Sequence, residues 1–477
     1  MKLLVVNPPR VQGYPVVREE RFEHKDIGSV YPPLSLLYCA AVAERAGWQV
    51  RMLDANGLDL SLGEVERALD EFRPDACVIR MGFDTQEPDL EVLKAARERG
   101  VFTMARLKIV GDTPWLRDEF MKQHPFVDLF FNDEPECLLE PVLKALESGK
   151  GMDQAPAVTH RLADGGFATT AEPPRLMDPD ELPYPAYHLL PSLKPYHTGV
   201  MDSPFTVVQS SRGCPFTCSF CAFGKLPFRK RDVVKVVDEL EWLKREHGLR
   251  HFLFFDDVLT LDQKRIEKMM NLMIERGLNL SWVCCTRANT VNKPMLQLMK
   301  RAGCREIAFG IESGSDEVLE GTTKGVTKDD IRQAARWCHE VGILFYGLAI
   351  IGLPGETEKS VEDTIAFINE IEPFYTQFGF CVPFPNTDTW NWYTDRGFLK
   401  TRDWAEFFPL ADRPIIRTEA LDGEALVRLR RRMYLKTMMR PGKLLRAVRW
   451  DDWRWNLRKA GSFLGRLALV AKGDAVR

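Results

Sequence analysis

Three cysteines lie close together near the middle of the chain, with the spacing Cys-x3-Cys-x2-Cys: Cys214, Cys218 and Cys221. A 4Fe-4S cluster normally takes one cysteine thiolate per iron. Three thiolates therefore hold three irons and leave the fourth open to a ligand from outside the protein. An iron with an open position can bind and activate a small molecule. The spacing predicts a catalytic iron-sulfur cluster.

The triplet has two other interpretations. A structural zinc site usually takes four ligands, often as two Cys-x2-Cys pairs, but the next cysteines after Cys221 are Cys284 and Cys285, far along the chain. Buried cysteines that act only as small hydrophobic side chains are the second alternative. Both match three cysteines in one short loop less well, so we favour the cluster.

The composition is that of a large globular protein. A chain of 477 residues is long enough for two or three domains, and 45% hydrophobic and 28% charged residues are ordinary values. The eleven cysteines are odd in number and scattered, which argues against a secreted disulfide framework. The apolar run at the N-terminus is too short for a signal peptide, and no stretch is apolar enough for a transmembrane helix. We expect a cytoplasmic protein.

Strands and helices alternate in the first third of the chain. The hydrophobic pattern predicts strands at residues 3–7, 50–53, 76–80, 108–110 and 127–131, and helices at 31–45, 62–72, 90–99 and 138–147. Such alternation indicates a parallel, doubly wound sheet. Ligands of these sheets bind at the carboxyl ends of the strands. The candidate ligand-binding residues are therefore those that follow strands: Asn7, Pro8, Asp54, Gly82, Gly111, Asp112 and Glu134.

Residues 173–204 are rich in proline, which resists both helices and central strands, so this segment is predicted to be a linker. Alternation resumes after it. Strands are predicted at residues 206–210, 251–255, 281–286, 306–311, 345–351 and 377–382, with helices at 233–246, 263–276, 293–302, 328–341 and 360–371. Six strands are too few for an eight-stranded barrel. In a barrel of this type, active groups lie at the carboxyl ends of the strands.

The cysteine loop resembles the cluster loop of the radical S-adenosylmethionine (SAM) superfamily, because Gly213-Cys214-Pro215 opens it and Phe220 precedes its last cysteine. The resemblance implies a partial (β/α)6 barrel. It also implies that the amine and carboxylate of SAM chelate the open iron. One electron, from an external donor such as flavodoxin or ferredoxin, then cleaves SAM to methionine and a 5'-deoxyadenosyl radical.

The resemblance also assigns SAM contacts to the ends of the later strands. An aspartate pair is expected near the amine, although helix capping is the alternative role. An arginine can pair with the carboxylate through two hydrogen bonds, although a solvated loop arginine looks the same in sequence. A Glu-Ser pair is expected at the ribose or methionyl group, and glycines let the backbone approach the adenine. These residues are Asp256, Asp257, Arg287, Glu312, Ser313, Gly352 and Gly355.

The order of an open α/β domain, a linker and this barrel resembles the cobalamin-binding-domain subgroup of the superfamily. The motifs that carry the likeness are Asn7-Pro8-Pro9, Tyr31-Pro32-Pro33-Leu34 and Glu134-Pro135-Glu136. The resemblance implies that cobalamin contacts Tyr31 and the strand-end residues named above. However, Gly111-Asp112-Thr113-Pro114 replaces a Gly-Gly-Pro-His segment, and no Asp-x-His-x-x-Gly segment supplies an axial histidine. A domain that kept the fold and lost the cofactor is the alternative.

The reaction depends on that cofactor. With cobalamin, the resemblance implies methylation of an unactivated carbon; without it, relatives carry out cyclisation, ring rearrangement or carbon-carbon coupling. A non-catalytic iron-sulfur or zinc protein is a remote third hypothesis. Cys381, near the last strand, is the candidate for a thiol beside the substrate.

The C-terminal segment differs from the rest in charge. The chain has a net charge of -3, but residues 426–477 hold fifteen Lys/Arg and three Asp, interleaved with apolar residues and tryptophans. This pattern suits an amphipathic helix on an anionic membrane, which would favour a lipid or isoprenoid substrate over another small molecule. A helix that packs on the barrel is the alternative. We expect no nucleic-acid partner. The predicted domain boundaries are 1–172, 173–204, 205–400 and 401–477.

Overall fold

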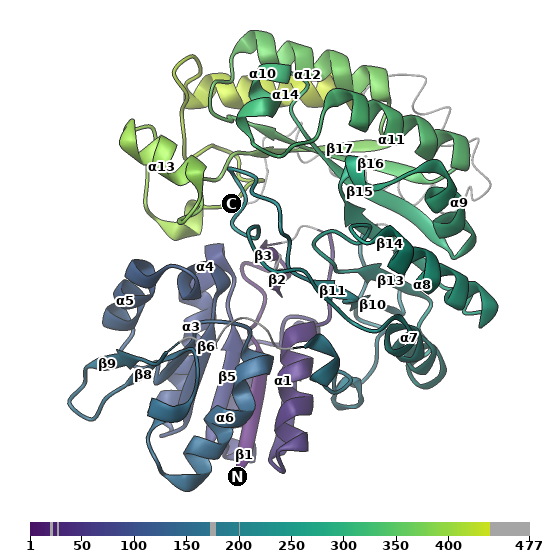
Figure 1. The fold of residues 1–477 in the computed structure, drawn as a ribbon. Coiled ribbons are helices and arrows are strands. Elements are labelled where there is room, and N and C mark those ends of the chain that lie inside the picture. Colours follow the sequence, from purple (N-terminus) through teal and green to yellow (C-terminus); the bar gives the residue numbers. More distant parts are fainter. Residues whose placement is uncertain (20–21, 26–27, 172–177, 200, 439–477) are drawn as a thin grey trace.

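The computed structural model describes residues 1–19, 22–25, 28–171, 178–199 and 201–438 (Figure 1). Two α/β domains follow each other along the chain, each built around its own sheet. The predicted fold class is confirmed: a doubly wound first domain, a six-stranded partial barrel and a helical C-terminal region. Most of the basic segment, residues 439–477, lies outside the described residues.

The first sheet has seven strands. In spatial order they are β4 (Gln49–Asp54), β1 (Lys2–Asn7), β5 (Ala76–Arg80), β6 (Phe102–Arg106), β7 (Leu129–Phe131), β8 (Val158–Arg161) and β9 (Phe167–Thr169). The first five are parallel, and β8 and β9 are antiparallel to their neighbours. Strands such as β1 and β5 are almost wholly buried, because helices cover both faces of the parallel part.

One predicted strand of this domain is wrong. Residues 108–110 belong to the short helix α4 (Lys108–Gly111), and the strand lies just before it, at β6. The hydrophobic pattern did not predict strand β6 because two of its residues, Thr103 and Arg106, are polar, although both are fully buried. Arg106 is satisfied inside the protein by the carbonyl of Phe131, at 3.2 Å, and by Asp112. A buried, paired arginine does not look like a core residue in sequence.

The other elements of the first domain surround its sheet. They are α1 (Leu34–Arg45), α2 (Leu62–Phe72), η1 (Phe83–Thr85), α3 (Gln86–Glu98), α5 (Pro114–Gln123), α6 (Pro135–Ser148) and η2 (Met152–Gln154). A hairpin that the hydrophobic pattern did not predict, β2 (Val16–Glu19) and β3 (Phe22–Lys25), lies where the two domains meet (Figure 1).

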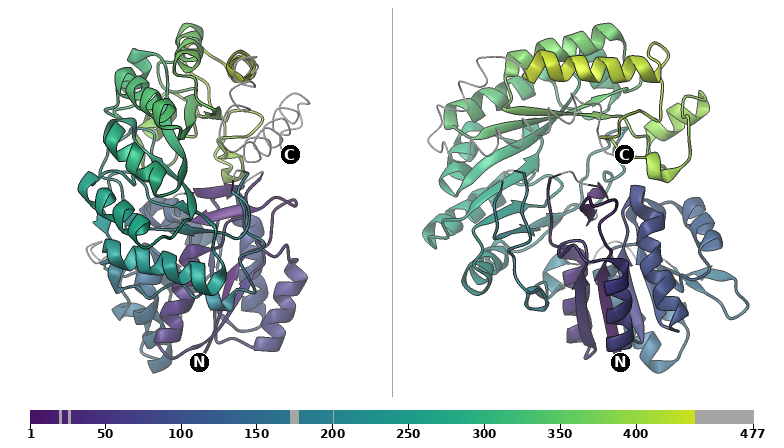
Figure 2. Two further views of the ribbon diagram at one scale, coloured as in Figure 1. Left: turned by 90° about the vertical axis from the view of Figure 1, so that its right-hand side faces the viewer. Right: turned by 180° about the vertical axis from the view of Figure 1, so that it is seen from behind.

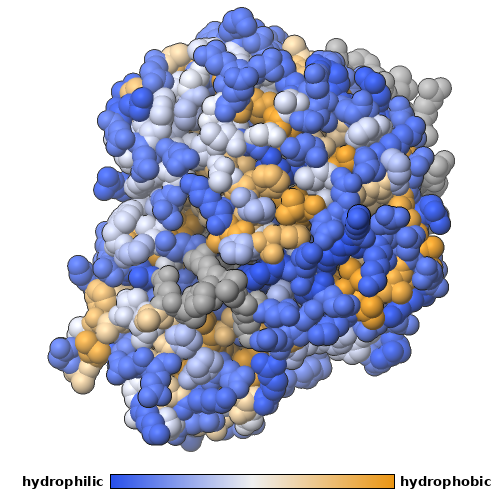
Figure 3. All heavy atoms as spheres, viewed as in Figure 1, coloured by the Kyte–Doolittle hydropathy of each residue, from blue (hydrophilic) through white to orange (hydrophobic). Residues whose placement is uncertain are grey.

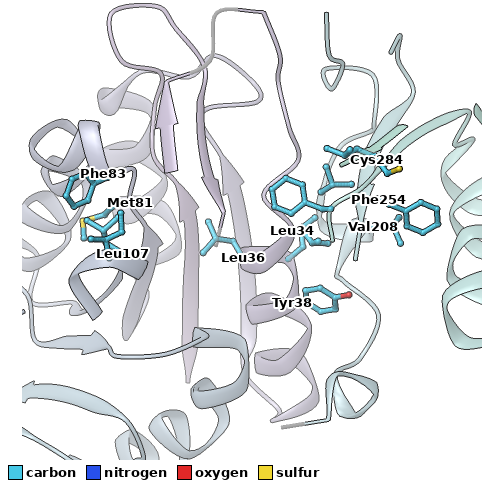
Figure 4. Close-up of a cluster of buried hydrophobic side chains, with 14 of the residues drawn as sticks. Leu34, Leu36, Tyr38, Met81, Phe83, Leu107, Val208, Phe254 and Cys284 are labelled. Carbon is cyan, nitrogen blue, oxygen red and sulfur yellow. The ribbon is translucent and has the colours of Figure 1, made fainter. Parts of the chain in front are cut away.

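Helix α1 is buried on all sides. Every residue from Leu34 to Ala43 is buried, as expected of a helix that is apolar around its whole circumference. Figure 4 shows the reason: Leu36 points toward the first sheet, while Leu34 and Tyr38 point toward the second domain, near Val208. The helix is therefore shared between the two domains and packs them together.

The predicted linker is packed against both domains. Its described residues include the turns η3 (Pro179–Glu181) and η4 (Tyr187–Leu189). The Tyr187 hydroxyl shares a 2.7 Å hydrogen bond with the hydroxyl of Thr206 in the second domain. The Tyr196 hydroxyl donates to Asp54 of the first domain, also at 2.7 Å. The proline-rich segment therefore helps to set the relative position of the domains.

The second sheet has the six predicted strands in sequence order, all parallel. They are β10 (Phe205–Val208), β13 (His251–Phe254), β14 (Ser281–Thr286), β15 (Cys304–Glu312), β16 (Leu344–Ile351) and β17 (Tyr375–Phe380). The helices and turns between them are α7 (Val233–His247), α8 (Gln263–Glu275), η5 (Ala288–Thr290), α9 (Lys293–Arg301), α10 (Asp316–Gly321), α11 (Lys328–Val341) and α12 (Glu358–Ile371). Figure 2 shows the sheet curving above the first domain.

After the last strand come α13 (Asp388–Asp395), η6 (Trp404–Glu406) and α14 (Gly423–Met438). Helix α14 packs on α12 and β17: the amide of Phe378 donates to the Tyr434 hydroxyl at 3.1 Å, and Lys436 pairs with Glu362 at 2.7 Å. The described part of the basic segment, residues 426–438, therefore lies in a helix packed on the barrel. Among the described residues, no helix is both long and apolar enough to cross a membrane.

A group of aromatic side chains forms a second contact between the domains. The ring of Phe83, in η1, lies 5.4 Å from those of Phe384 and Trp404 and 5.8 Å from that of Phe407. Figure 3 shows hydrophobic atoms gathered across the middle of one face, between two largely hydrophilic halves. Apolar contacts of this kind make the two domains one packed unit.

Candidate active site

The cysteine loop is closed at its base by a short antiparallel ribbon, β11 (Ser211–Arg212) and β12 (Arg229–Lys230). The loop begins at Gly213, whose φ is +84°. A side chain at this position would also collide with the backbone carbonyl of Pro227. Only glycine fits such a turn, so its place directly before Cys214 has a structural reason.

Cys214 and Cys218 lie near enough to Cys221 in this loop to affect its titration. Burial, together with the neighbouring Cys218 and Cys214 thiols, raises the pKa of the Cys221 thiol to about 12. The amide of Phe223 donates to the Cys221 sulfur at 3.4 Å. Within the part of the chain that the structure describes, no three His, Cys, Asp or Glu side chains are close enough to hold a single metal ion. Three thiols spread along one loop, with a donor to sulfur, fit a cluster that takes one thiolate per iron.

Arg287 lies directly beside this loop and is buried. Its guanidinium stacks 3.5 Å from the ring centroid of Phe216, and its Nη1 donates to the Cys218 sulfur at 3.6 Å. Its Nη2 donates to the carbonyl of Lys324. The predicted carboxylate-binding arginine is thus next to a candidate iron ligand, although its contact with SAM stays a prediction.

The two aspartates after β13 have different surroundings. Asp256 is fully buried, and its carboxylate accepts from the Ser210 amide at 2.8 Å, the Ser210 hydroxyl at 2.6 Å and the Ser211 hydroxyl at 2.5 Å. Asp257 accepts from the amide of Gly213 at 2.9 Å. Asp256 therefore supports the strand that leads into the loop, while Asp257 lies at the loop itself.

Glu312 is the last residue of β15 and Ser313 follows it, and both are buried. Glu312 has a φ of 59° and pairs with Lys324 at 2.5 Å. The Ser313 hydroxyl shares a 3.2 Å hydrogen bond with the Thr364 hydroxyl, on helix α12. The two predicted SAM contacts are thus held by different neighbours, and the lysine partner of Glu312 was not anticipated from the sequence.

Gly352 and Gly355 both have positive φ, +90° and +79°. The amide of Gly352 donates to the carboxyl of Glu356, and its carbonyl accepts from the Tyr393 hydroxyl. Cys381 is buried beside Tyr393, and burial raises the pKa of its thiol to about 12. A neutral, enclosed thiol is a poor nucleophile, so a role for Cys381 beside the substrate stays a prediction.

In the first domain, the strand-end residues bond to one another. The Asn7 amide donates to Asp54 at 2.7 Å, and Asp54 also accepts from Tyr196. Arg18 was missed by sequence reasoning because an isolated arginine gives no signal. It donates to the side chain of Asn7 at 3.2 Å and to the carbonyl of Pro8 at 3.0 Å. The side chains of Asn7 and Asp54 and the carbonyl of Pro8 therefore have partners within the protein. The predicted contacts of these three residues with cobalamin stay predictions.

Two other residues that were predicted to contact cobalamin, Gly82 and Tyr31, also contact other parts of the protein. The amide of Gly82 donates to Asp89 at 2.9 Å, and Tyr31 packs its ring 5.8 Å from that of Phe205 in the second domain.

Gly111 and Asp112 lie at the end of helix α4, not directly after a strand as predicted. A side chain at Gly111 would collide with Arg106, and Asp112 accepts from Lys108 at 2.7 Å. This glycine is required by close packing.

A cavity that is partly open to solvent lies between the first domain and the cysteine loop. It brings together two predicted residues, Glu134 and Asp257, with Glu19, Leu34, Ser35, Tyr38, Lys108, Asp133, Glu136, Gln209, Arg212, Gly213, Phe223, Leu226, Pro227, Arg229 and Phe255. Two residues that line it, Ser35 and Glu136, each have a buried side-chain oxygen without a hydrogen-bond partner. Orphaned polar atoms at a cavity indicate a place for a polar ligand or water.

Comparison with known proteins agrees with this architecture. A family model described as the radical SAM superfamily matches residues 208–368. The uncharacterized methyltransferase PH0819 of Pyrococcus horikoshii is 31% identical over 456 residues, covering 94% of this chain and 95% of that protein. The anaerobic magnesium-protoporphyrin IX monomethyl ester cyclase of Rubrivivax gelatinosus is 26% identical, covering 85% and 73%.

A solved structure has the same fold. The radical SAM methyltransferase TsrM from Kitasatospora setae, with cobalamin and a 4Fe-4S cluster bound, superposes with a TM-score of 0.65 at 18% identity, covering 83% of this chain and 75% of that one. An open α/β domain joined to a six-stranded barrel with a three-cysteine loop defines a class of radical enzyme. The chain belongs to the radical SAM superfamily. It is an enzyme that uses a 4Fe-4S cluster and SAM.

Proposed function

We propose that this enzyme uses cobalamin to methylate an unactivated carbon of a small-molecule substrate. The observation that carries the proposal is the cavity between the two domains. First-domain residues such as Glu136 bound it on one side, and the cysteine loop bounds it on the other. Ligands held by the two domains would therefore meet there, as a methyl donor and a radical source must.

In this proposal the cofactors supply the reactive groups, and the protein's side chains hold and orient the cofactors. When bound, the cluster and SAM supply a 5'-deoxyadenosyl radical and cobalamin supplies the methyl group. The loop cysteines hold the cluster, and Arg287 pairs with the carboxylate of SAM. Asp257 accepts from the amine, since it lies at the loop, whereas Asp256 supports the strand behind it. The glycines after β16 leave room for the adenine.

Two side-chain oxygens of residues that line the cavity support the binding of a corrin there. The Ser35 hydroxyl and the free oxygen of Glu136 can bond to the carboxamide side chains at its edge. The sequence has no Asp-x-His-x-x-Gly segment, so other residues of the first domain would hold the corrin. The alternative, a domain that kept only the fold, predicts that these two atoms are served by water.

A test is possible without knowing the substrate. Methyl transfer from SAM to a bound corrin releases S-adenosylhomocysteine, whereas radical formation releases 5'-deoxyadenosine. The protein should be produced with and without cobalamin, reconstituted anaerobically, and incubated with SAM and a reductant. We expect a stoichiometric corrin absorbance and both products in the first preparation, and 5'-deoxyadenosine alone in the second.

The absence of corrin, together with 5'-deoxyadenosine as the sole product in both preparations, would contradict methylation. It would favour the second candidate, a radical cyclase or ring-rearranging enzyme. The similarity to the magnesium-protoporphyrin cyclase is the observation that supports this candidate.

Two partners belong to the proposal. An external one-electron donor, such as flavodoxin or ferredoxin, reduces the cluster. Peripheral membrane contact through 426–477 is expected only of residues beyond helix α14, since the helix packs its apolar face on the barrel. Flotation of the full-length protein with anionic liposomes tests this contact, and failure to float would contradict it.

A further inference from the structure

The ribbon at the base of the cysteine loop places two arginines directly opposite each other. Arg212 on β11 pairs with Arg229 on β12, and the ribbon is only two residue pairs long. Like charges that face each other across two strands destabilise the pairing. So short a ribbon needs a counter-charge to stay closed.

That counter-charge comes from the other domain. The carboxylate of Glu134 lies 2.7 Å from Nη1 of Arg212 and 2.5 Å from Nη2 of Arg229, so one residue bridges both arginines. Glu136 adds a second contact to Arg212, at 2.8 Å. The three bridged side chains are 7%, 17% and 13% exposed, in the order Arg212, Arg229 and Glu134. Ion pairs this far from water are screened little by salt.

The local fold explains why Glu134 reaches the ribbon. It lies between strand β7 and helix α6, which begins at Pro135. Glu134 is the N-cap residue of α6 and Glu136 lies in its first turn, where the positive end of the helix dipole favours carboxylates. Proline at the first helical position restricts the backbone between them. Both carboxylates are therefore presented to the second domain from a rigid corner of the first.

The rest of the loop is fastened inside the second domain. The amide of Ser219 donates to the carbonyl of Thr322 at 2.8 Å, and the hydroxyl of Thr323 donates to the carbonyl of Thr217 at 2.7 Å. The arginine ribbon is thus the part of the loop that is tied to the first domain. Its position decides how the three cysteines lie against the cavity.

We propose that Glu134, acting through Arg212 and Arg229, is a positioning residue that ties the base of the cluster loop to the first domain. The residue was predicted to contact cobalamin; its role here is to hold the loop that binds the iron. This inference rests on membership of the radical SAM superfamily and not on cobalamin or methyl transfer, so it can be tested whether or not the proposed function holds.

The first measurement is hydrogen-deuterium exchange of the anaerobic full-length protein. Glu134→Gln keeps the size of the side chain and removes its charge. Amides of residues 211–230 should exchange faster than in the wild type, while those of β14 should be unchanged. Glu140→Gln is the matched control, because Glu140 lies on the same helix and forms exposed ion pairs with Arg45 and Lys144. It should leave residues 211–230 unchanged.

The second measurement separates positioning from folding. After reconstitution, Glu134→Gln should retain its iron content and unfolding midpoint. The change that SAM causes in the electron paramagnetic resonance signal of the reduced cluster should be altered. Formation of 5'-deoxyadenosine should slow by about 10- to 100-fold, as expected when a reacting group is misplaced.

The double variant Glu134→Gln with Arg229→Gln decides the cause. Removing one arginine removes the repulsion across the ribbon, but the tie from Glu134 to the ribbon stays absent, so exchange and 5'-deoxyadenosine formation should stay as altered as in Glu134→Gln alone. Glu134→Gln that matches the wild type in exchange and in product formation would overturn the proposal. A double variant that returns to wild-type values would overturn it as well, because Glu134 would then serve only to neutralise the charge of the ribbon.

Discussion

Asp256 and Asp257 are adjacent in the chain, yet their carboxylates serve different parts of the site. Asp256 is buried among Ser210 and Ser211, at the end of the first barrel strand, and burial raises the pKa of its carboxyl. Asp257 accepts from Gly213, at the start of the cysteine loop, and lines the cavity. One aspartate therefore supports the scaffold, and the other lies where a ligand would bind.

Asparagine substitutions should separate the two roles. Asp256→Asn puts an amide among hydrogen-bond donors, so we expect the free energy of unfolding to fall by about 1–3 kcal/mol. Asp257→Asn should leave the unfolding midpoint nearly unchanged and weaken the binding of SAM. Denaturant unfolding and a SAM-binding titration measure the two effects. Wild-type affinity in Asp257→Asn would show that this carboxylate does not contact SAM.

The cysteine loop gives a second prediction. Cys218→Ala leaves only two thiols, so we expect loss of the 4Fe-4S absorbance and of 5'-deoxyadenosine formation after reconstitution. Cys338→Ala is the matched control, because Cys338 is buried in helix α11 as a small hydrophobic residue. That control should keep its cluster and activity. A Cys218→Ala variant that still cleaves SAM would contradict the assignment of the cluster ligands.

Much of the fold could be predicted because parallel strands are buried on both faces and read as apolar runs. Strand β14, for example, was predicted over the same residues, 281–286. Strand β6 was missed because Arg106 is a core residue only through its partners. The hairpin β2–β3 was missed because it is short and has no apolar run.

The site was predictable where local spacing carries the chemistry, as for the cysteines and the glycines of the turns. It was not predictable where a partner comes from far along the chain. Glu134 and Arg212 are separated by 78 positions, and Arg18 and Asp89 by 71. Nothing in the sequence around either residue indicates its partner, because such pairs depend on how the domains pack.

The close packing of the Glu312–Lys324 ion pair leads to a third prediction. Gly310 lies on the same strand, and a side chain there would collide with the Glu312 carboxylate and the Lys324 ammonium group. Gly310→Ala should therefore displace the pair and lower the free energy of unfolding by about 1–3 kcal/mol, as overpacking does. It should also slow 5'-deoxyadenosine formation.

Gly321→Ala is the control for this prediction, since a side chain at Gly321 would meet no atom within 4 Å. Alanine is a better helix former than glycine, so this control should be neutral or slightly stabilising. Equal unfolding midpoints for Gly310→Ala and the wild type would show that the ion pair can move without cost.

The buried carboxyl of Glu356 predicts an unusual pH dependence. Burial raises its pKa from the ordinary value of 4.5 to about 8. Between these values, the native state keeps a proton that the unfolded chain has lost. The free energy of unfolding should therefore fall as pH rises, by up to about 1.4 kcal/mol per pH unit. Glu356→Gln keeps an accepting oxygen for the Gly352 amide but cannot titrate, so its stability should lack this decline and exceed that of the wild type near pH 8.

Denaturant unfolding of the apoprotein, followed anaerobically between about pH 5.5 and 8.5, measures this difference. Glu358→Gln is the matched control, because Glu358 is exposed at the start of α12, and it should follow the wild-type profile. Because only the folded-state pKa of Glu356 distinguishes the variants, the gap between Glu356→Gln and the wild type should widen steadily with pH. Parallel profiles for these two proteins would mean that the carboxyl ionises at its ordinary pKa in the folded state, and that the loop after β16 carries a buried charge.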